Sequence, residues 1–249
     1  MASAPTGTIV LTDPRIYFAQ WDISADLSKV QMSVTPDPQD DTVLGQTFRT
    51  RKPGLLKGKI HAEGYSQFNA TATSAIDGRL YTNIGAQDIP ISVSAKGCNA
   101  GDTAFFMKAM FAKYALGGSV GQMLKFQMDA ECSGVDPVLA TGFVMVDASA
   151  SRSNAYSGPG LQLGALSATQ KMRVAVHLLA VSGGNFAANS YSAVASDFSG
   201  ATARGGSAVY TVPGSEVYTI SGPITDTWWR WTPNGTFSSA TFLVIAGIL

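Results

Sequence analysis

Polar and apolar residues alternate along much of the chain with a period of two. The clearest run is Leu124–Cys132, in which the apolar residues Leu124, Phe126, Met128, Ala130 and Cys132 are separated by Lys125, Gln127, Asp129 and Glu131. Successive side chains of a β-strand point to opposite faces, so this run predicts a strand with one dry face and one charged face. Val30–Val34 repeats the alternation.

Further strands are predicted by similar runs, because Gly, Pro, Asn and Asp stand between them at turn spacing. These runs are Arg15–Ala19, Leu56–Tyr65, Ile89–Ala95, Thr103–Tyr114, Leu139–Ala148, Met172–Val181, Ser207–Val212, Glu216–Ile220, Thr227–Thr232 and Ala240–Ile248. The segment 74–85 has helical spacing instead, with Ser74 as a candidate N-cap and Gly85 as a candidate stop. We therefore expect an all-β chain with one short helix.

The length of 249 residues allows one large all-β domain or two ordinary ones. Ser149–Gly160 is small, polar and interrupted by Gly and Pro, as linkers are. We expect a β-sandwich or barrel domain over residues 1–150 and a second, β-sandwich-like domain over residues 156–249. Thr35–Thr47 is a long acidic link between two strands, and loops of that length are usually functional or disordered.

Charge is sparse and balanced, with 17 basic and 17 acidic residues and 14% charged residues in all. The whole chain therefore predicts no general affinity for nucleic acid or anionic lipid. No apolar run reaches the ~18 residues that a membrane helix needs, and the first residues lack the basic and apolar regions of a signal peptide. Cys98 and Cys132 fit no metal or redox spacing, and they are interpreted as free thiols or, alternatively, as a disulfide between neighbouring strands.

Candidate catalytic and metal-binding residues are few. His177 lies in an apolar strand pattern and is interpreted as a hydrogen-bonded structural residue, and His61 as a surface or channel-face residue. Two isolated histidines predict no zinc site, and we expect no metal, no cofactor and no enzyme activity. Asp129 and Glu131 share a strand face, as glycosidase carboxylates can, but alternation on a wetted face explains them more simply.

One region gathers basic residues in an otherwise weakly charged chain. It reads GQTFRTRKPGLLKGKIHAEGY over Gly45–Tyr65 and follows directly after the acidic link. The order of strand, acidic arm, Gly-x-Thr-x-Arg-x-x-x-Pro-Gly-Leu turn and strand resembles the major tail tube protein of long-tailed (siphovirus-type) bacteriophages. The matching residues are Gly45, Thr47, Arg49, Pro53, Gly54, Leu55, Glu63, Gly64 and Tyr65.

The resemblance implies a structural virion protein with a tail-tube-type domain. Copies of the chain would form rings, each contributing strands to a continuous β-barrel, and the rings would stack into a tail tube through which DNA passes at ejection. The implied partners are other copies, as hexameric or alternatively trimeric rings, and other tail proteins such as the tape measure and the tail terminator. The implied location is the virion tail, with assembly in the host cytoplasm and no membrane contact.

A wet channel face is the role that the resemblance implies for the polar side of two strands, and their alternation agrees with it. A strongly basic lining would bind the phosphates of passing DNA, whereas a mixed lining would let it slide. The candidate lumen-facing residues are Lys57, Lys59, His61, Glu63, Lys125, Gln127, Asp129 and Glu131.

Contacts between rings are the function that we predict for the opposite charges of the acidic link and the basic turn, and pairing within one subunit is the alternative. Complementary charges fix register more than they add affinity. The candidate inter-ring residues are Asp37, Asp40, Asp41, Arg49, Arg51 and Lys52.

A carbohydrate-binding or adhesive β-sandwich protein is the alternative function, suggested by Trp228, Trp229 and Trp231. Alternation places Trp229 and Trp231 on one face and Trp228 with Arg230 on the other, so we expect at least one of these pairs to be core.

Overall fold

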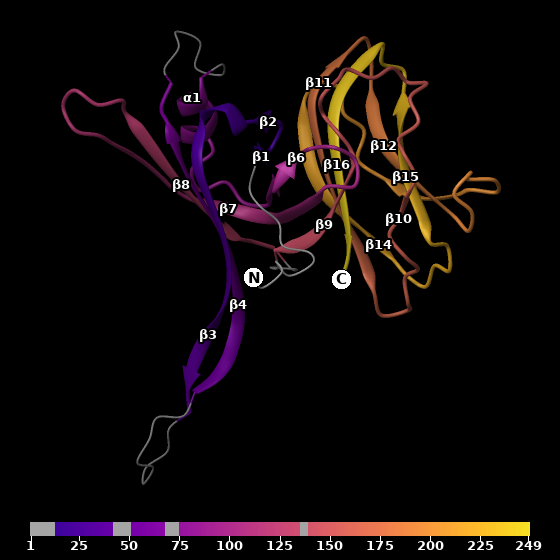
Figure 1. Cartoon of the computed structure of the whole chain (residues 1–249), viewed down its shortest axis with the longest axis horizontal. Coiled ribbons are helices and arrows are strands. Elements are labelled where there is room, and N and C mark those ends of the chain that lie inside the picture. Colours follow the sequence, from indigo (N-terminus) through magenta and orange to yellow (C-terminus); the bar gives the residue numbers. More distant parts are fainter. Residues whose placement is uncertain (1–12, 42–50, 68–74, 135–138) are drawn as a thin grey trace, which may run out of the picture. The chain divides into compact units, whose positions relative to one another are not determined.

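The computed structural model describes residues 13–41, 51–67, 75–134 and 139–249, which are nearly all β-structure (Figure 1). The strands are β1 (Asp13–Phe18), β2 (Trp21–Asp22), β3 (Leu27–Asp40), β4 (Arg51–Tyr65), β5 (Ile89–Ser94), β6 (Lys96–Gly97), β7 (Thr103–Gly117), β8 (Lys125–Cys132), β9 (Ala140–Val146), β10 (Leu161–Gln162), β11 (Lys171–Ser182), β12 (Phe186–Ala193), β13 (Thr202–Gly206), β14 (Gly214–Ser221), β15 (Trp228–Gly235) and β16 (Ser239–Ile248). One α-helix, α1 (Ile76–Tyr81), and one 3-10 turn, Ser24–Asp26, complete the described elements. The predicted class, all-β with one short helix, is confirmed.

Two compact units divide the chain. The sandwich unit comprises Met1–Ala25, Ile89–Met107 and Ala140–Leu249, and the arm unit comprises Asp26–Asp88 and Lys108–Leu139. The units are interleaved in sequence, because β7 contributes its first residues to one and its remainder to the other. The predicted division into a domain over residues 1–150 and a second domain over residues 156–249 follows chain order and stays a prediction.

The sandwich unit packs two antiparallel sheets face to face. One contains β14, β11, β16 and β9 in that order, and the other contains β10, β15, β12 and β13. Their facing side chains form one hydrophobic core, in which Trp229, Trp231, Phe186 and Phe242 are fully buried. The expected sandwich architecture is therefore present, and no closed barrel forms among the described strands.

β11 and β16 are buried on both faces, which explains why their sequences are almost continuously apolar. Beyond β9, the sheet continues through β7, β5, β1 and β2. A second core lies on the outer side of β11 and β16, where Ala175 and Ile245 pack with Tyr17. The unit thus has two layers of buried side chains, one on each side of its central strands.

His177 joins these layers. Its Nδ1–H donates to the Ala19 carbonyl at 2.5 Å, and its Nε2 accepts from the Ser92 hydroxyl at 2.7 Å. The ring is fully buried, and burial lowers the pKa of His177 to about 4. The interpretation of His177 as a hydrogen-bonded structural residue is confirmed.

The arm unit is built on four antiparallel strands in the order β3, β4, β8, β7. In β8, Phe126, Met128 and Ala130 are buried while Lys125 and Gln127 are exposed, as the alternation predicts. Helix α1 covers the dry face, because Tyr114 on that face donates a hydrogen bond of 2.7 Å to Asp77 of the helix. The other face carries the polar side chains.

The helix begins one residue later than expected. Its N-cap is Ala75, which provides no side-chain hydrogen bond, so the prediction of Ser74 as N-cap is wrong. Ser74 itself lies outside the described residues. The buried residues Ile76 and Leu80, one turn apart, fix the helix by packing in place of a cap.

The long acidic link is partly strand. β3 continues to Asp40, and Pro36 and Pro38 lie opposite Leu56 and Pro53 across an irregularity in the pairing. Proline lacks the N–H that an interior strand needs, but β3 pairs only with β4 among the described strands, so the edge position tolerates both prolines.

The last third contains a strand that the alternation misplaced. Ser207–Val212 was predicted as a strand, but only an isolated bridge at Tyr210 forms there, and β13 precedes it. β12 was missed because its sequence, FAANSYSA, consists mostly of small or polar residues. Ser190 and Ser192 are nevertheless fully buried, since their hydroxyls find hydrogen-bond partners.

Candidate assembly surface

The predicted lumen-facing residues lie together on the polar face of the arm unit. In the pairing of β4 with β8, Lys59 is opposite Glu131, His61 is opposite Asp129, and Glu63 is opposite Gln127. Lys125 is opposite Tyr65 at one end of the pairing. Lys57 lies beyond the end of β8, where its neighbour is Thr35 of β3.

A chain of alternating charges crosses three strands of this face. His61 Nδ1 lies 2.6 Å from an Asp129 oxygen, and Nε2 lies 2.9 Å from a Glu63 oxygen. Lys59 extends the chain to Asp129 at 3.0 Å, and Lys29 of β3 extends it to Glu63 at 3.4 Å. Lys29 was not among the predicted site residues, although its place in the alternation of β3 puts it on this face.

The contacts of His61 favour its charged form. Each ring nitrogen faces a carboxylate oxygen, and only the imidazolium has an N–H on both nitrogens to donate. Hydrogen bonds to Glu63 and Asp129 accordingly raise the pKa of His61. The hydrogen bond with His61 lowers the pKa of Glu63. Burial by itself would raise the pKa of Asp129, but the hydrogen bonds with His61 and Lys59 outweigh burial and lower it.

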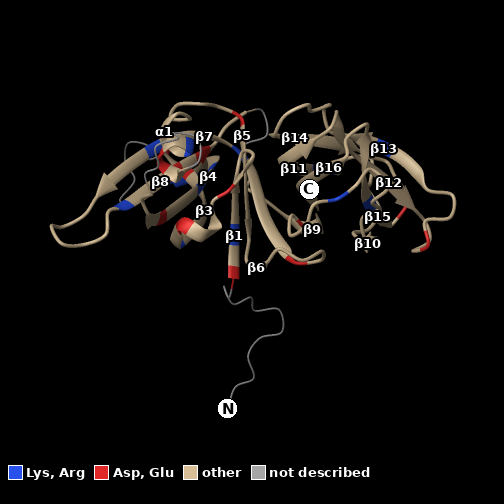
Figure 2. Cartoon of the chain, turned by 90° about the horizontal axis from the view of Figure 1, so that it is seen from above, with Lys and Arg blue, Asp and Glu red and all other residues tan. Residues whose placement is uncertain are grey.

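The predicted lumen set carries little net charge. It contains three lysines and three carboxylates, which cancel, so that only His61 can add a charge. Figure 2 shows basic and acidic residues interspersed around β3, β4, β7 and β8. Such a face offers a polyanion no continuous row of free cations to bind.

The charges of the arm, which we define as Thr35–Asp41 with Arg51–Lys57, are paired within the hairpin. Lys52 lies 2.8 Å from Asp41, and Lys57 lies 3.7 Å from Asp37. Asp40 is directly opposite Arg51 in the register. The alternative of pairing within one subunit therefore describes these contacts, and a role between rings stays a prediction; the sixth candidate, Arg49, lies outside the described residues.

Close backbone contacts explain two of the glycines that match the tail tube pattern, Gly54 and Gly64. A Cβ at Gly54 would overlap the carbonyl oxygen of Asp37, and a Cβ at Gly64 would overlap that of Asp26. Both positions therefore require glycine, because the backbone of β3 at Asp37 and of the preceding 3-10 turn at Asp26 passes too close for a side chain. Gly45, Thr47 and Arg49 of the motif lie outside the described residues.

The four-stranded sheet of the arm unit has two edges with unpaired backbone. β3 pairs only with β4 in the described chain. On the other side, hydrogen bonds from Ala95 to Thr103 and from Phe111 to Ala86 place the preceding segment beside β7 as far as Phe111. Beyond that point, only β8 lies beside the described residues of β7, so residues 113–117 form a second edge. Such edges are templates for pairing with another chain.

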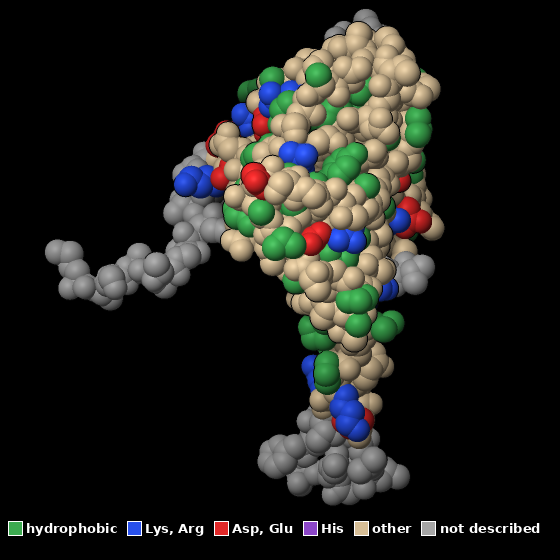
Figure 3. Space-filling view, turned by 90° about the vertical axis from the view of Figure 1, so that its right-hand side faces the viewer, with side chains coloured by type: hydrophobic (Ala, Val, Ile, Leu, Met, Phe, Trp, Pro, Cys, Tyr) green, Lys and Arg blue, Asp and Glu red, His purple; other side chains and the backbone are tan. Residues whose placement is uncertain are grey.

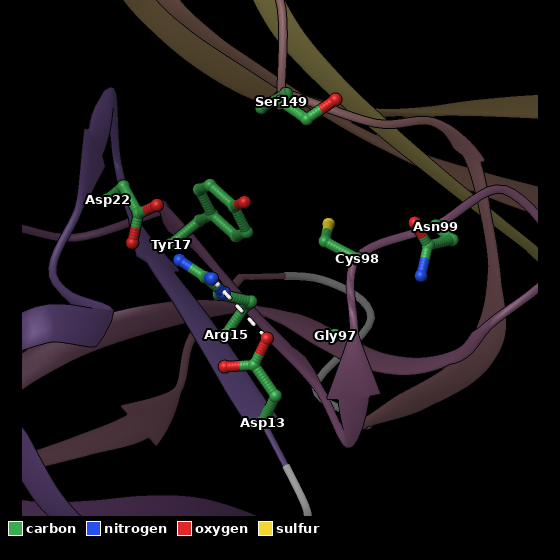
Figure 4. Close-up of a pocket in the computed structure, with 9 residues that line it drawn as sticks. Asp13, Arg15, Tyr17, Asp22, Gly97, Cys98, Asn99 and Ser149 are labelled. Atoms are coloured by element: carbon green, nitrogen blue, oxygen red, sulfur yellow. Dashed lines mark hydrogen bonds and ion pairs between the residues drawn. The ribbon is translucent and has the colours of Figure 1, made fainter.

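A polar pocket of about 370 Å³ lies in the sandwich unit (Figure 4). Asp13 and Arg15 of its wall form an ion pair of 3.3 Å, and Tyr17 stands beside Cys98. Burial raises the pKa of the Cys98 thiol to about 11, so the thiol is protonated and a poor nucleophile at neutral pH. Cys98 and Cys132 are both free thiols, as the first of the two sequence interpretations predicts.

The tryptophans that suggested sugar binding are mostly core. Trp229 and Trp231 are fully buried, and their indole N–H groups donate to the Gly164 carbonyl and the Tyr218 hydroxyl. The expectation that one pair is core is confirmed. Only Trp228 is left half-buried on the open side of β15 to contact a sugar ring.

Other classes of site were searched among the described residues. No group of three or more His, Cys, Asp and Glu side chains is placed to hold a metal ion in that part of the chain. Within the same residues, no helix has both the length and the apolar character to cross a bilayer.

The chain is similar to known proteins in structure alone. No protein-family model and no curated protein sequence matches the chain. Among solved structures, the SPP1 tail tube is similar with a TM-score of 0.36 and 16% identity, over 50% of this chain and 75% of that one. The SPP1 Dit protein, described as a hub adsorption apparatus, is similar with a TM-score of 0.35 and 11% identity, over 95% and 99% of the two chains.

The tail of an empty gene transfer agent particle, refined with C6 symmetry, is similar with a TM-score of 0.32 and 16% identity, over 44% of this chain and 79% of that one. The solved structures that resemble this chain thus include phage tail tube and hub proteins. Because every TM-score is below 0.5, we rest no functional argument on these likenesses.

Proposed function

We propose that the protein is a structural component of a phage tail that self-assembles into stacked rings, forming the tail tube through which DNA is ejected. The observation that carries the proposal is the four-stranded sheet of the arm unit, with one dry face, one self-neutralised polar face and an unpaired backbone at both edges. A second support is the resemblance of Gly45–Tyr65 to the tail tube protein of long-tailed bacteriophages. The role is mechanical, with no catalytic step.

The strand directions are compatible with ring closure. β3, β4, β8 and β7 alternate in direction, so β3 and β7 run opposite to each other. When copies add side by side in one orientation, β7 of one copy meets β3 of the next in the antiparallel sense. Each copy then contributes four strands to a continuous sheet, and the two open edges disappear.

The polar face would line the lumen in this arrangement. Helix α1 covers the dry face, so the charged chain through His61 faces the bore. Glu63 and Asp129 are already paired with Lys29 and Lys59, and DNA could pass without displacing them. A hexameric ring is favoured and a trimeric ring is the alternative, if residues 156–249 are a diverged second tube-like domain instead of an outer decoration.

A measurement of assembly tests the proposal directly. Light scattering of the purified full chain, combined with negative-stain images, gives the number of copies and reveals a central hole. Rings or hollow rods are the expected result. A compact monomer at high concentration, both in solution and in native particles, would contradict the proposal.

Proline substitutions at the β3 edge test the mode of closure. Adjacent residues of a strand direct their N–H groups to opposite sides, so Val30→Pro and Gln31→Pro remove one N–H facing β4 and one facing outward. The variant that loses the N–H facing away from β4 should keep the circular dichroism spectrum of the wild type and fail to form rings. The inward one is the matched control, which should weaken the β3–β4 pairing itself. Ring formation by both variants would overturn closure through β3.

The charged arm is proposed to set the register between rings. The double substitution Asp40→Lys with Asp41→Lys puts like charges beside Arg51 and Lys52, both of which are exposed. Misaligned or shorter tubes are expected in images taken at physiological salt. Normal tubes from this variant would rule out the register role and leave ring formation standing.

A further inference from the structure

Exposed apolar side chains gather at two places in the arm unit that the charge pattern does not explain. The arm patch lies along the hairpin and consists of Val34, Leu55 and Leu56. The tip patch lies on the turn between β7 and β8 and consists of Leu116, Val120, Met123 and Leu124. Exposed apolar groups that cluster in this way mark interaction sites, whereas scattered ones need no explanation.

The arm patch lies where the sheet narrows to two strands. Val34 and Leu56 continue the dry face of β3 and β4, but the pairing of β4 with β8 stops at Lys59. Beyond that point, β4 pairs only with β3 among the described strands. Leu55 is 83% exposed, and Figure 3 shows hydrophobic side chains along the arm above the basic ones near its end.

The tip patch belongs to a stretch without charge. No charged residue occurs between Lys113 and Lys125, and Val120 is fully exposed. A hollow of about 220 Å³ lies beside it, lined by Ala115, Leu116 and Gly117 on one side and by Lys125 and Gln127 on the other. The tip therefore offers both apolar side chains and a shallow recess.

The two patches lie at opposite ends of the same sheet (Figure 1). The tip joins β7 and β8 where Gly117 is opposite Lys125, and Lys125 is opposite Tyr65, the last residue of β4. The arm patch lies near the first residues of β4, where Leu56 is opposite Pro36. Copies stacked head to tail along the strand direction would therefore bring an arm to a tip.

We propose that the arm patch of one copy docks on the tip patch of a second copy in the next ring, with Leu55 entering the recess beside Leu116. This inference rests on the proposed ring assembly and names the surface that receives the arm. The contact is heterologous, since two different surfaces meet, and it does not close on itself, so it extends into a filament. The arm's lysines already have partners in their own hairpin, which makes an apolar contact the more direct source of adhesion.

Substitutions in the full chain separate stacking from ring closure. Leu55→Asn with Leu56→Asn makes the arm patch more polar, and Val120→Asn with Met123→Asn does the same to the two most exposed residues of the tip patch. Each variant should form rings and lose long tubes in negative-stain images. The matched control is Val209→Asn with Val212→Asn in the sandwich unit, whose side chains are 66% and 65% exposed and which should stack normally.

Cross-linking gives a second reading that does not depend on tube length. A Leu55→Cys chain mixed with a Val120→Cys chain should form a disulfide-linked dimer on oxidation with diamide, and neither chain alone should do so beyond the background from Cys98 and Cys132. Tubes from both patch variants, or rings lost along with tubes, would overturn the stacking contact while ring assembly is judged separately. A wild-type chain that forms no rings would remove both proposals.

Discussion

The two units use similar strands for different ends. The sandwich unit spreads 7 basic and 7 acidic residues over 154 residues and buries both faces of its central strands. The arm unit holds 10 and 10 in 95 residues and keeps one face of its sheet wet. A strand that is covered twice stabilises its own chain, whereas a strand with a wet face and an open edge has bonding capacity left for another copy.

Removing a core tryptophan of the sandwich unit should give the largest loss of stability. Trp231→Ala empties a fully buried site in the sandwich core and frees the Tyr218 hydroxyl from its partner. We expect the free energy of unfolding to fall by about 3–5 kcal/mol. Urea titration followed by tryptophan fluorescence measures the change. Trp228→Ala, at a half-buried position of the same strand, is the control and should cost clearly less.

Acid should weaken the sandwich unit through His177. Its folded pKa is about 4, below the ordinary value of 6.5, so the unfolded chain binds the proton first. The stability that His177 contributes is present above about pH 6.5 and is lost as pH falls toward 4, by about 3 kcal/mol in total. Urea titrations from pH 7 to 4 on the wild type and His177→Gln measure this loss. An equal acid dependence in both proteins would contradict the assignment.

His61 should show the opposite sign in the arm unit. Its folded pKa is raised by Glu63 and Asp129, so its contribution is present below the unfolded value and is lost as pH rises through the folded pKa. The His61 side chain is partly exposed, and water screens its interactions, so the effect should be about 1 kcal/mol or less. NMR titration of the imidazole protons follows the proton directly. Replacing Glu63 and Asp129 with Gln and Asn should return the pKa toward its ordinary value.

The exposed ion pairs of the arm should matter least for stability. Lys52→Ala breaks the pair with Asp41, but the lysine side chain is 75% exposed and screened by water. The free energy of unfolding should change by less than about 0.5 kcal/mol. Thermal denaturation is the measurement. A larger loss would mean that the arm charges hold the hairpin itself, and the contrast between units would narrow.

The sequence was informative where burial followed a simple period. The alternation of β8 and the second half of β4 places every polar candidate from Lys59 to Glu131 on one face, because a half-buried strand must segregate its residues. β12 escaped notice because its core contacts are made by Ala and Ser, which carry no strong period. The part of β3 after Val34 was read as a link because proline argues against strands in general, although edge positions accept it.

Long-range partners could not be predicted from one sequence. The alternation places His61 on a surface or channel face but does not predict its hydrogen bond with Glu63 or the contact of Glu63 with Lys29, because strand register decides which side chains meet. The interleaving of the two units was also missed, since a domain estimate made along the chain assumes continuous segments. β7 breaks that assumption by serving both units.

Pro36 and Pro38 bear on the life of a newly made subunit before it finds its neighbours. The last part of β3, from Pro36 to Asp40, pairs poorly with a strand of another protein, since Pro36 and Pro38 have no amide hydrogen to donate. The inner half, Leu27–Thr35, stays receptive. Newly made subunits would then resist uncontrolled fibre growth, yet keep one short edge segment that can pair with another copy of the chain.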